Sequence, residues 1–268
     1  DLSAQASSSA APLHSSTGIE THFTQGLDQV PRARPVFAFH RPETLADWLA
    51  QASADPPGAP ATVLTTDGQL PPAEAQRPTG GTMLARLQAM PPLVTEWGDF
   101  KLWPAQITAI RNLEKSLAAN KPRALIQMAT GSGKTFTAIS FIYRLIKFAG
   151  ARRVLFLVDR GNLGRQTKKE FDQYVSPVNN YKFGEEFIVQ HLTSNQLDRS
   201  ARVCISTIQR MFSMLKGREL PDEADEESTS AAESVFDKEP EPIDYNPAFP
   251  IETFDIIVTD EAHRSIYN

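Results

Sequence analysis

The chain has 268 residues, a formal net charge of −5, 41% hydrophobic and 22% charged residues, which is typical of a globular protein with one sizeable domain and a lesser segment. No apolar run approaches the roughly 20 residues of a membrane helix, and the start lacks a basic leader, so we expect a cytoplasmic protein that does not contact a membrane. The single cysteine, Cys204, excludes an internal disulfide framework and fits a core position better than a reactive thiol.

The composition of residues 1–96 predicts little regular structure. They are rich in proline and contain no lysine, and residues 53–82 have the turn composition of an irregular linker with one short strand at "ATVLTT". One amphipathic helix is expected in "HRPETLADWLAQA", where Pro42 precedes an apolar face that includes Trp48. We therefore predict a mostly irregular Pro-rich segment ahead of a folded domain at residues 97–268.

Apolar strands and helices alternate after residue 97. The predicted strands are residues 123–128, 153–159, 186–192, 202–207 and 254–260, and the predicted helices are residues 134–148, 162–174 and 208–216. Repeated βα units with mostly apolar strands predict an α/β fold in which a parallel sheet carries helices on both faces. In such sheets the ligand binds at the carboxyl ends of the strands.

A glycine-rich turn joins the first predicted strand to its helix in "IQMATGSGKTFTAI". Gly131 and Gly133 allow backbone N–H groups to approach one anion closely, and the start of the helix adds partial positive charge. Lys134 would neutralise the outer phosphates of a nucleotide, and the Thr135 hydroxyl would ligate Mg²⁺. A chance turn with a surface lysine is the alternative, which the position between strand and helix disfavours. We therefore predict that ATP and Mg²⁺ are bound by Thr130, Gly131, Ser132, Gly133, Lys134 and Thr135.

An acidic stretch interrupts the pattern before its last strand. Residues 222–241 hold nine acidic residues and one lysine, a local charge of −8 that leaves +3 on the rest of the chain. Such a stretch, poor in apolar residues, is typical of a solvated surface loop rather than of a dedicated binding tail. We place this acidic loop at residues 217–250, and the net charge therefore does not exclude a nucleic-acid partner.

Two adjacent carboxylates follow the last predicted strand in "FDIIVTDEAH". Asp260 is placed to hold Mg²⁺ through water, and Glu261 to orient and deprotonate an attacking water. Adjacent acids at a strand end are common by chance, but here they accompany an upstream phosphate loop. We therefore predict that Lys134, Asp260 and Glu261 carry ATP hydrolysis. His263 alone would be a surface histidine, but in this context we expect it to couple the nucleotide site to a second part of the protein.

Four of these motifs occur together in one known family. "MATGSGKT", "VLFLVDR", "ISTIQRM" and "DEAHRS" stand in the order of the first RecA-like lobe of superfamily 2 helicases, and residues 97–268 most resemble the motor subunit of type I restriction enzymes. The resemblance implies ATP-driven pumping of double-stranded DNA in a complex with specificity and methylation subunits. The segment "TGIETHFTQGLDQVPRARPVFAFHRPETL" resembles the link between that subunit's nuclease domain and its motor, so residues 1–96 are interpreted as a linker or bridging segment, with the tail of a missing nuclease domain as the alternative.

The resemblance also assigns roles to residues outside the phosphate loop. Gln106 in "LWPAQITAI" matches the glutamine that reads adenine, although an exposed helix residue is an equal alternative. Four further residues match positions that grip the DNA backbone, and each could instead be an ordinary cap or surface residue: Arg160, Thr207, Gln209 and Arg210. We carry them forward as predicted DNA contacts.

Two parts of a complete motor of this family are expected to be missing from the chain. The second RecA-like lobe, which supplies arginine fingers, would have to follow Asn268. The nuclease needs a Glu-x-Lys or Gln-x-Lys element, and residues 1–100 contain no lysine. We therefore expect a fragment that binds ATP, hydrolyses it barely above background on its own, and does not cut DNA.

Three other functions compete with a restriction motor. A stand-alone superfamily 2 repair or remodelling helicase would share the same lobe. A non-enzymatic ATP-binding module is disfavoured by the pair Asp260 and Glu261, and a phosphoryl-transfer kinase by the lack of a recognisable acceptor site or lid.

Overall fold

The computed structural model describes residues 11–28, 31–53, 81–98, 100–217, 220 and 246–260. Several sequence predictions lie outside these residues, namely the strand at "ATVLTT", the acidic residues 222–241, Glu261 and His263. Among the described helices, none has the length and apolar character needed to cross a membrane.

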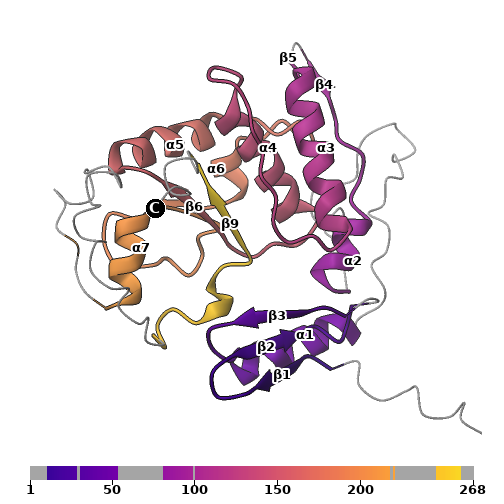
Figure 1. Cartoon of the computed structure of the whole chain (residues 1–268). Helices are drawn as coiled ribbons and strands as arrows, with labels where there is room; N and C mark the ends of the chain where they lie inside the picture. The colour runs from indigo at the N-terminus through magenta and orange to yellow at the C-terminus, as the bar shows by residue number, and fades with distance from the viewer. Residues whose placement is uncertain are drawn as a thin grey trace, which may run out of the picture.

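Four parallel strands form the central sheet (Figure 1). They are β6 (Val154–Val158), β7 (Val189–His191), β8 (Val203–Thr207) and β9 (Ile256–Thr259), and they pair in the order β7-β8-β6-β9. Because parallel neighbours run in the same direction, their carboxyl ends lie at one edge of the sheet. The predicted α/β fold with a parallel sheet is confirmed.

Helices cover both faces of this sheet because side chains alternate along each strand. On β6, Val154 and Phe156 join the main core cluster with residues of α3 (Pro104–Ala118), α4 (Lys134–Lys147) and α5 (Gly161–Gln173). Leu155 packs instead with Cys204 and with Met214 of α7 (Ile208–Leu215). The predicted two-faced cover and the core position of the cysteine are therefore confirmed. The helices after residue 81 are α2 (Met83–Gln88), α3 (Pro104–Ala118), α4 (Lys134–Lys147), α5 (Gly161–Gln173), α6 (Phe183–Glu186) and α7 (Ile208–Leu215), and a small hairpin joins β4 (Glu96–Trp97) to β5 (Phe100–Lys101).

Residues 123–128, predicted as the first strand of the sheet, are not a strand in the structure. Leu125 is 78% exposed, although Ile126 packs against the main core cluster. An apolar run indicates burial, but a strand also needs a neighbour with which to form a hydrogen-bonded ladder. In the part of the chain that the structure describes, β9 pairs with β6 alone, and Ile257 on β9 is 62% exposed. The predicted strand over residues 186–192 is likewise shortened to β7.

A second, smaller unit precedes the sheet, and we call residues 11–28 and 31–53 the upstream unit. Its strands β1 (Leu13–Ser16), β2 (Thr21–Thr24) and β3 (Ala33–Val36) pair antiparallel and are followed by α1 (Pro42–Ser53), as Figure 1 shows in indigo and violet. Phe23 is fully buried in this unit, and its ring centroid lies 5.8 Å from that of Trp48 on α1. The predicted helix is confirmed. The strands were not predicted, because runs of four residues are too short to show a period of two.

Candidate nucleotide site

The predicted phosphate loop is a tight turn that leads into α4. The N–H and the hydroxyl of Ser132 both donate to the carbonyl oxygen of Ala129, at 3.2 and 2.6 Å. Gly131 and Gly133 have φ values of +75° and +76°, in the left-handed region that residues with a Cβ rarely adopt. The two glycines are therefore required by the shape of this turn.

The N-terminus of α4 has the chemistry of an anion site. Gly133 is its N-cap residue and has no side chain that could accept from the first N–H groups of the helix. The helix dipole adds partial positive charge at the same end, next to Lys134. Thr135, half-buried in the first turn, brings a hydroxyl oxygen, which is a ligand type that Mg²⁺ accepts. Phosphate oxygens and Mg²⁺ therefore fit the groups that this end of the helix presents.

Gln106 supports the loop from α3. Its side chain is 6% exposed, its Oε1 accepts from the N–H of Trp103 at 2.9 Å, and its Nε2 donates to the carbonyl oxygen of Ser132 at 3.3 Å. A Cβ added to Gly133 would lie 2.6 Å from that same Nε2. Gln106 is thus a buried residue in contact with the loop, and not the exposed helix residue that the sequence left open.

Buried polar contacts fix the far end of α4. Nζ of Lys147 donates to Oε1 of Glu186 at 2.6 Å, and the hydroxyl of Tyr143 donates to Oε2 of the same carboxylate at 2.7 Å. Burial raises the pKa of Tyr143 well above its ordinary value, so this hydroxyl stays a donor. Arg144 is paired with Glu114 in the same region. Removing one member of such a buried pair is costly, so these contacts hold the helix that carries the loop.

The carboxyl ends of β6 and β9 bring two aspartates to one edge of the sheet. The backbone N–H of Asp260 donates to the carbonyl oxygen of Leu157 at 2.9 Å, so the ladder between β6 and β9 reaches this residue. Asp159 is buried at the end of β6, and Nε of Arg160 donates to its Oδ2 at 3.3 Å. Asp159 was not predicted as a site residue. The signal was available, because "RVLFLVD" closes on an acid just as "FDIIVTD" does.

The four predicted DNA contacts differ in how much side chain they present to solvent. Arg160 is the N-cap residue of α5, and its side chain is 41% exposed. Thr207 is buried as the N-cap residue of α7, where its hydroxyl accepts from the N–H of Arg210 at 3.1 Å. Arg210 is 2% exposed, and Gln209 is half-buried. The geometry of Thr207 is that of an ordinary cap, and DNA contact by these residues stays a prediction.

A family model described as "Type III restriction enzyme, res subunit" matches residues 99–268. This region contains the phosphate loop, the parallel sheet and Asp260. No solved structure gave a significant match to the chain.

Curated relatives are endonuclease subunits of type I restriction enzymes. The chain is 32% identical over 159 residues to the EcoKI endonuclease subunit of Escherichia coli (strain K12), covering 59% of this chain and 11% of that protein. It is 44% identical over 63 residues to the EcoAI endonuclease subunit of Escherichia coli, covering 24% of this chain and 8% of that protein. It is also 29% identical over 114 residues to the SauCOLORF180P endonuclease subunit of Staphylococcus aureus (strain COL), covering 42% of this chain and 12% of that protein. The matches thus span between 8% and 12% of the relatives' length.

Proposed function

The chain belongs to the family described as "Type III restriction enzyme, res subunit", and from that premise we propose that it is the ATP-binding lobe of the DNA-translocating motor of a type I restriction enzyme. The motor binds and hydrolyses ATP to pump double-stranded DNA, in the cytoplasm and in a complex with specificity and methylation subunits. The relatives named as type I restriction endonuclease subunits support this function over that of a stand-alone repair or remodelling helicase.

One observation carries the proposal, namely the left-handed Gly133 at the N-terminus of α4 with Gln106 packed behind it. The N-cap residue offers no side-chain acceptor to the first N–H groups of α4, and a bound phosphate is an acceptor that would satisfy them. Lys134, the first residue of α4, adds a full positive charge beside these groups. We assign to these groups the binding of the outer phosphates of ATP.

The remaining chemistry belongs to three oxygen-bearing side chains. Thr135 and Asp260 would hold Mg²⁺, and this ion supplies positive charge that offsets the charge of the phosphates. Glu261, which follows Asp260 directly in the sequence, orients the attacking water and takes its proton. Its neighbour Asp260 lies at the carboxyl end of β9, the edge of the sheet where ligands of parallel α/β folds bind.

DNA is bound through its phosphate backbone, because phosphate contacts carry no sequence information and a translocating motor passes along any sequence. Arg160 is the predicted contact best placed for this, because its half-exposed guanidinium lies at the carboxyl end of β6. Its pairing with Asp159 links a DNA contact to the strand next to β9. The proposal therefore assigns DNA and nucleotide to the same edge of the sheet.

Calorimetric titration of Mg·ADP into the wild-type chain and into Lys134→Ala tests this function. Loss of a charge-assisted phosphate contact costs about 1.5 to 3 kcal/mol, so affinity should fall by roughly 10- to 150-fold. Lys168→Ala is the matched control, because Lys168 forms an exposed pair with Asp172 on α5. Equal affinities of Lys134→Ala and the wild type would remove the phosphate site.

A further inference from the structure

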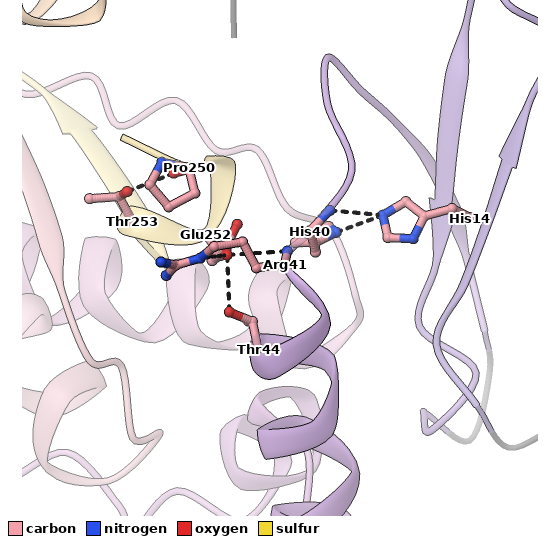
Figure 2. Close-up of polar contacts among 7 residues, drawn as sticks. All are labelled: His14, His40, Arg41, Thr44, Pro250, Glu252 and Thr253. Atoms are coloured by element: carbon pink, nitrogen blue, oxygen red, sulfur yellow. Dashed lines mark hydrogen bonds and ion pairs between the residues drawn. The ribbon is translucent and has the colours of Figure 1, made fainter. Parts of the chain in front are cut away.

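Glu252 is a buried carboxylate that the upstream unit reaches across a gap of 211 positions in the chain (Figure 2). Its Oε1 accepts from Nε of Arg41 at 2.7 Å, from the backbone N–H of Arg41 at 3.3 Å and from the hydroxyl of Thr44 at 3.0 Å. The side chain of Glu252 is 4% exposed, whereas that of Arg41 is 52% exposed. The carboxylate is therefore enclosed, and the upstream unit supplies these three donors.

This contact joins the start of α1 to the segment that leads into β9. Arg41 immediately precedes α1, so the carboxylate lies at the helix end that favours negative charge. Glu252 belongs to the short 3₁₀ helix η1 (Ile251–Thr253), which the hydroxyl of Thr253 closes by donating to the carbonyl oxygen of Pro250 at 2.6 Å. Glu252 thus brings a negative charge from the other part of the protein to the N-terminus of α1.

The carboxylate of Glu252 is satisfied on one side only. Its second oxygen, Oε2, is buried and has no hydrogen-bond partner among the residues that the structure describes. This unpaired oxygen offsets part of what the donors to Oε1 contribute. The donors to Oε1 nevertheless outweigh burial and lower the pKa of Glu252, so the charge is retained. A charged, half-satisfied group at a junction between two units points to a positional role.

The chain runs from Glu252 to Asp260 without a flexible break. Oδ2 of Asp255 accepts from the N–H groups of Arg152 and Arg153, at 2.6 and 3.2 Å, and so fixes the start of β9 against the start of β6. The two strands then pair along β9, and the N–H of Asp260 makes the last bond of the ladder. A shift of η1 would therefore be passed along β9 to its carboxyl end.

The upstream unit makes a second contact, with the segment that joins α3 to the phosphate loop. Nη1 of Arg32 donates to the carbonyl oxygen of Asn120 at 2.7 Å. Asn120 has a left-handed φ of 56° just after α3 and begins the segment that leads to the phosphate loop. The upstream unit thus touches the two segments that lead into the loop and into Asp260, each on its N-terminal side.

We propose that Glu252 is a positioning residue for the nucleotide site, through which the upstream unit holds β9 and thereby the carboxylate of Asp260 in place. The inference rests on the proposed function, because the placement of Asp260 matters only if this residue serves a nucleotide site. Docking of the upstream unit then sets how well that site is assembled. A partner or domain that displaces the upstream unit would loosen the site without touching it.

The experiment compares three variants of the full-length protein with the wild type. Glu252→Gln removes the charge, Thr44→Val removes one donor at nearly constant shape, and Thr44→Ser keeps that donor. Amide exchange of a peptide covering residues 254–260 reports on β9. The Mg²⁺ concentration that half-saturates ATP hydrolysis reports on the site, and melting temperature reports on overall folding. Asp172→Asn is the control, since it breaks an exposed pair on α5.

Glu252→Gln and Thr44→Val should speed exchange in β9 and raise the half-saturating Mg²⁺ concentration by about 3- to 10-fold, within the range of coupling effects known at a distance. Thr44→Ser and Asp172→Asn should behave as the wild type in all three readouts. The melting temperature of Glu252→Gln is expected to fall, because a charge that accepts from Arg41 is lost, and Thr44→Val, which keeps that charge, tests the two site readouts without this loss. Unchanged exchange and Mg²⁺ dependence in Glu252→Gln would overturn the inference, as would a lowered melting temperature with both readouts unchanged. Lys134→Ala separates the two proposals: if it hydrolyses ATP as the wild type does, the proposed function fails, whatever Glu252 does.

Discussion

The side-chain amide of Gln106 donates a hydrogen bond to the carbonyl oxygen of Ser132 over 3.3 Å. Through this bond α3 supports the phosphate loop, because the other end of the same amide accepts from the N–H of Trp103 at the start of α3. The loop therefore does not rest on its glycines alone. Its shape depends on a residue that lies 26 positions upstream.

Replacing Gln106 by alanine should weaken nucleotide binding while the fold persists. Two hydrogen bonds are lost, which corresponds to about 1 to 2 kcal/mol, or roughly a 5- to 30-fold fall in the affinity for Mg·ADP. Gln88→Ala is the matched control, because Gln88 also donates from a side-chain amide to a backbone carbonyl, that of Ala118, far from the loop. Comparing the affinities for ADP and GDP distinguishes two roles of Gln106. A loss confined to ADP would mean that Gln106 reads adenine, and an equal loss would mean that it holds the loop.

The two glycines of the loop should respond differently to substitution. Gly131→Ala and Gly133→Ala both place a Cβ at a left-handed φ, at about 1 to 2 kcal/mol each. Only at Gly133 would the new Cβ displace Nε2 of Gln106, since among the described residues, its chain neighbours aside, none has an atom within 4 Å of the Cβ built at Gly131. Nucleotide affinity should therefore fall further in Gly133→Ala. In the double variant Gln106→Ala/Gly133→Ala, the loss of binding free energy should be smaller than the sum of the losses in the two single variants. A loss equal to that sum would contradict the contact between the two residues.

The sequence predicted the elements whose signal is long or strongly apolar. α4, α5 and α7 and the strands β6, β8 and β9 lie where periodicity and apolar runs place them, within the usual shift of element ends. The glycine pattern predicted the left-handed turn at Gly131 and Gly133, because few other residues adopt that conformation. These features are local, so the sequence carries them directly.

Pairing and long-range contacts could not be predicted in the same way. Residues 123–128 have the composition of a buried strand, but whether a strand forms depends on a neighbour with which it can pair. The bond from Gln106 to Ser132 and the contacts of Glu252 with Arg41 and Thr44 join segments far apart in the chain. No spacing in one sequence encodes them. Composition likewise missed the small sheet of the upstream unit, whose strands have four residues each.

The upstream unit should lose stability in mild acid. The backbone N–H of His40 donates to Nε2 of His14 at 3.3 Å, and the same Nε2 lies 2.9 Å from Nδ1 of His40. A hydrogen bond between two ring nitrogens needs one of them as an unprotonated acceptor, so protonation of both rings would break it. Burial lowers the pKa of both, that of His40 to about 4. Since an unfolded histidine titrates near 6.5, the unfolded state binds more protons between about pH 6.5 and 4, and stability falls as pH falls through that window.

Amide exchange of β2 at pH 7 and pH 5, corrected for intrinsic rates, measures this effect. Protection should drop at pH 5 in the wild type and in His22→Gln, because His22 is on the same strand with a partly exposed ring. In His40→Gln the drop should shrink. The same drop in all three proteins would show that other groups cause it.

Hydrolysis should depend on Glu261 far more than binding does. Glu261→Gln in the full-length protein removes the base but keeps the shape, so turnover should fall by about 10² to 10⁴ while the affinity for Mg·ATP stays within a few-fold. Single-turnover hydrolysis and equilibrium binding together separate these effects. Wild-type turnover in the variant would exclude Glu261 as the base.

Steady-state ATP hydrolysis by the full-length protein, measured with and without duplex DNA, tests whether this protein is a DNA-translocating motor. We predict hydrolysis that duplex DNA stimulates, that falls more than about 100-fold in Lys134→Ala, and that persists in Lys168→Ala, whose lysine pairs with Asp172 on α5. Hydrolysis at the wild-type rate in Lys134→Ala, or no response to duplex DNA, would contradict a DNA-translocating motor built on this phosphate loop.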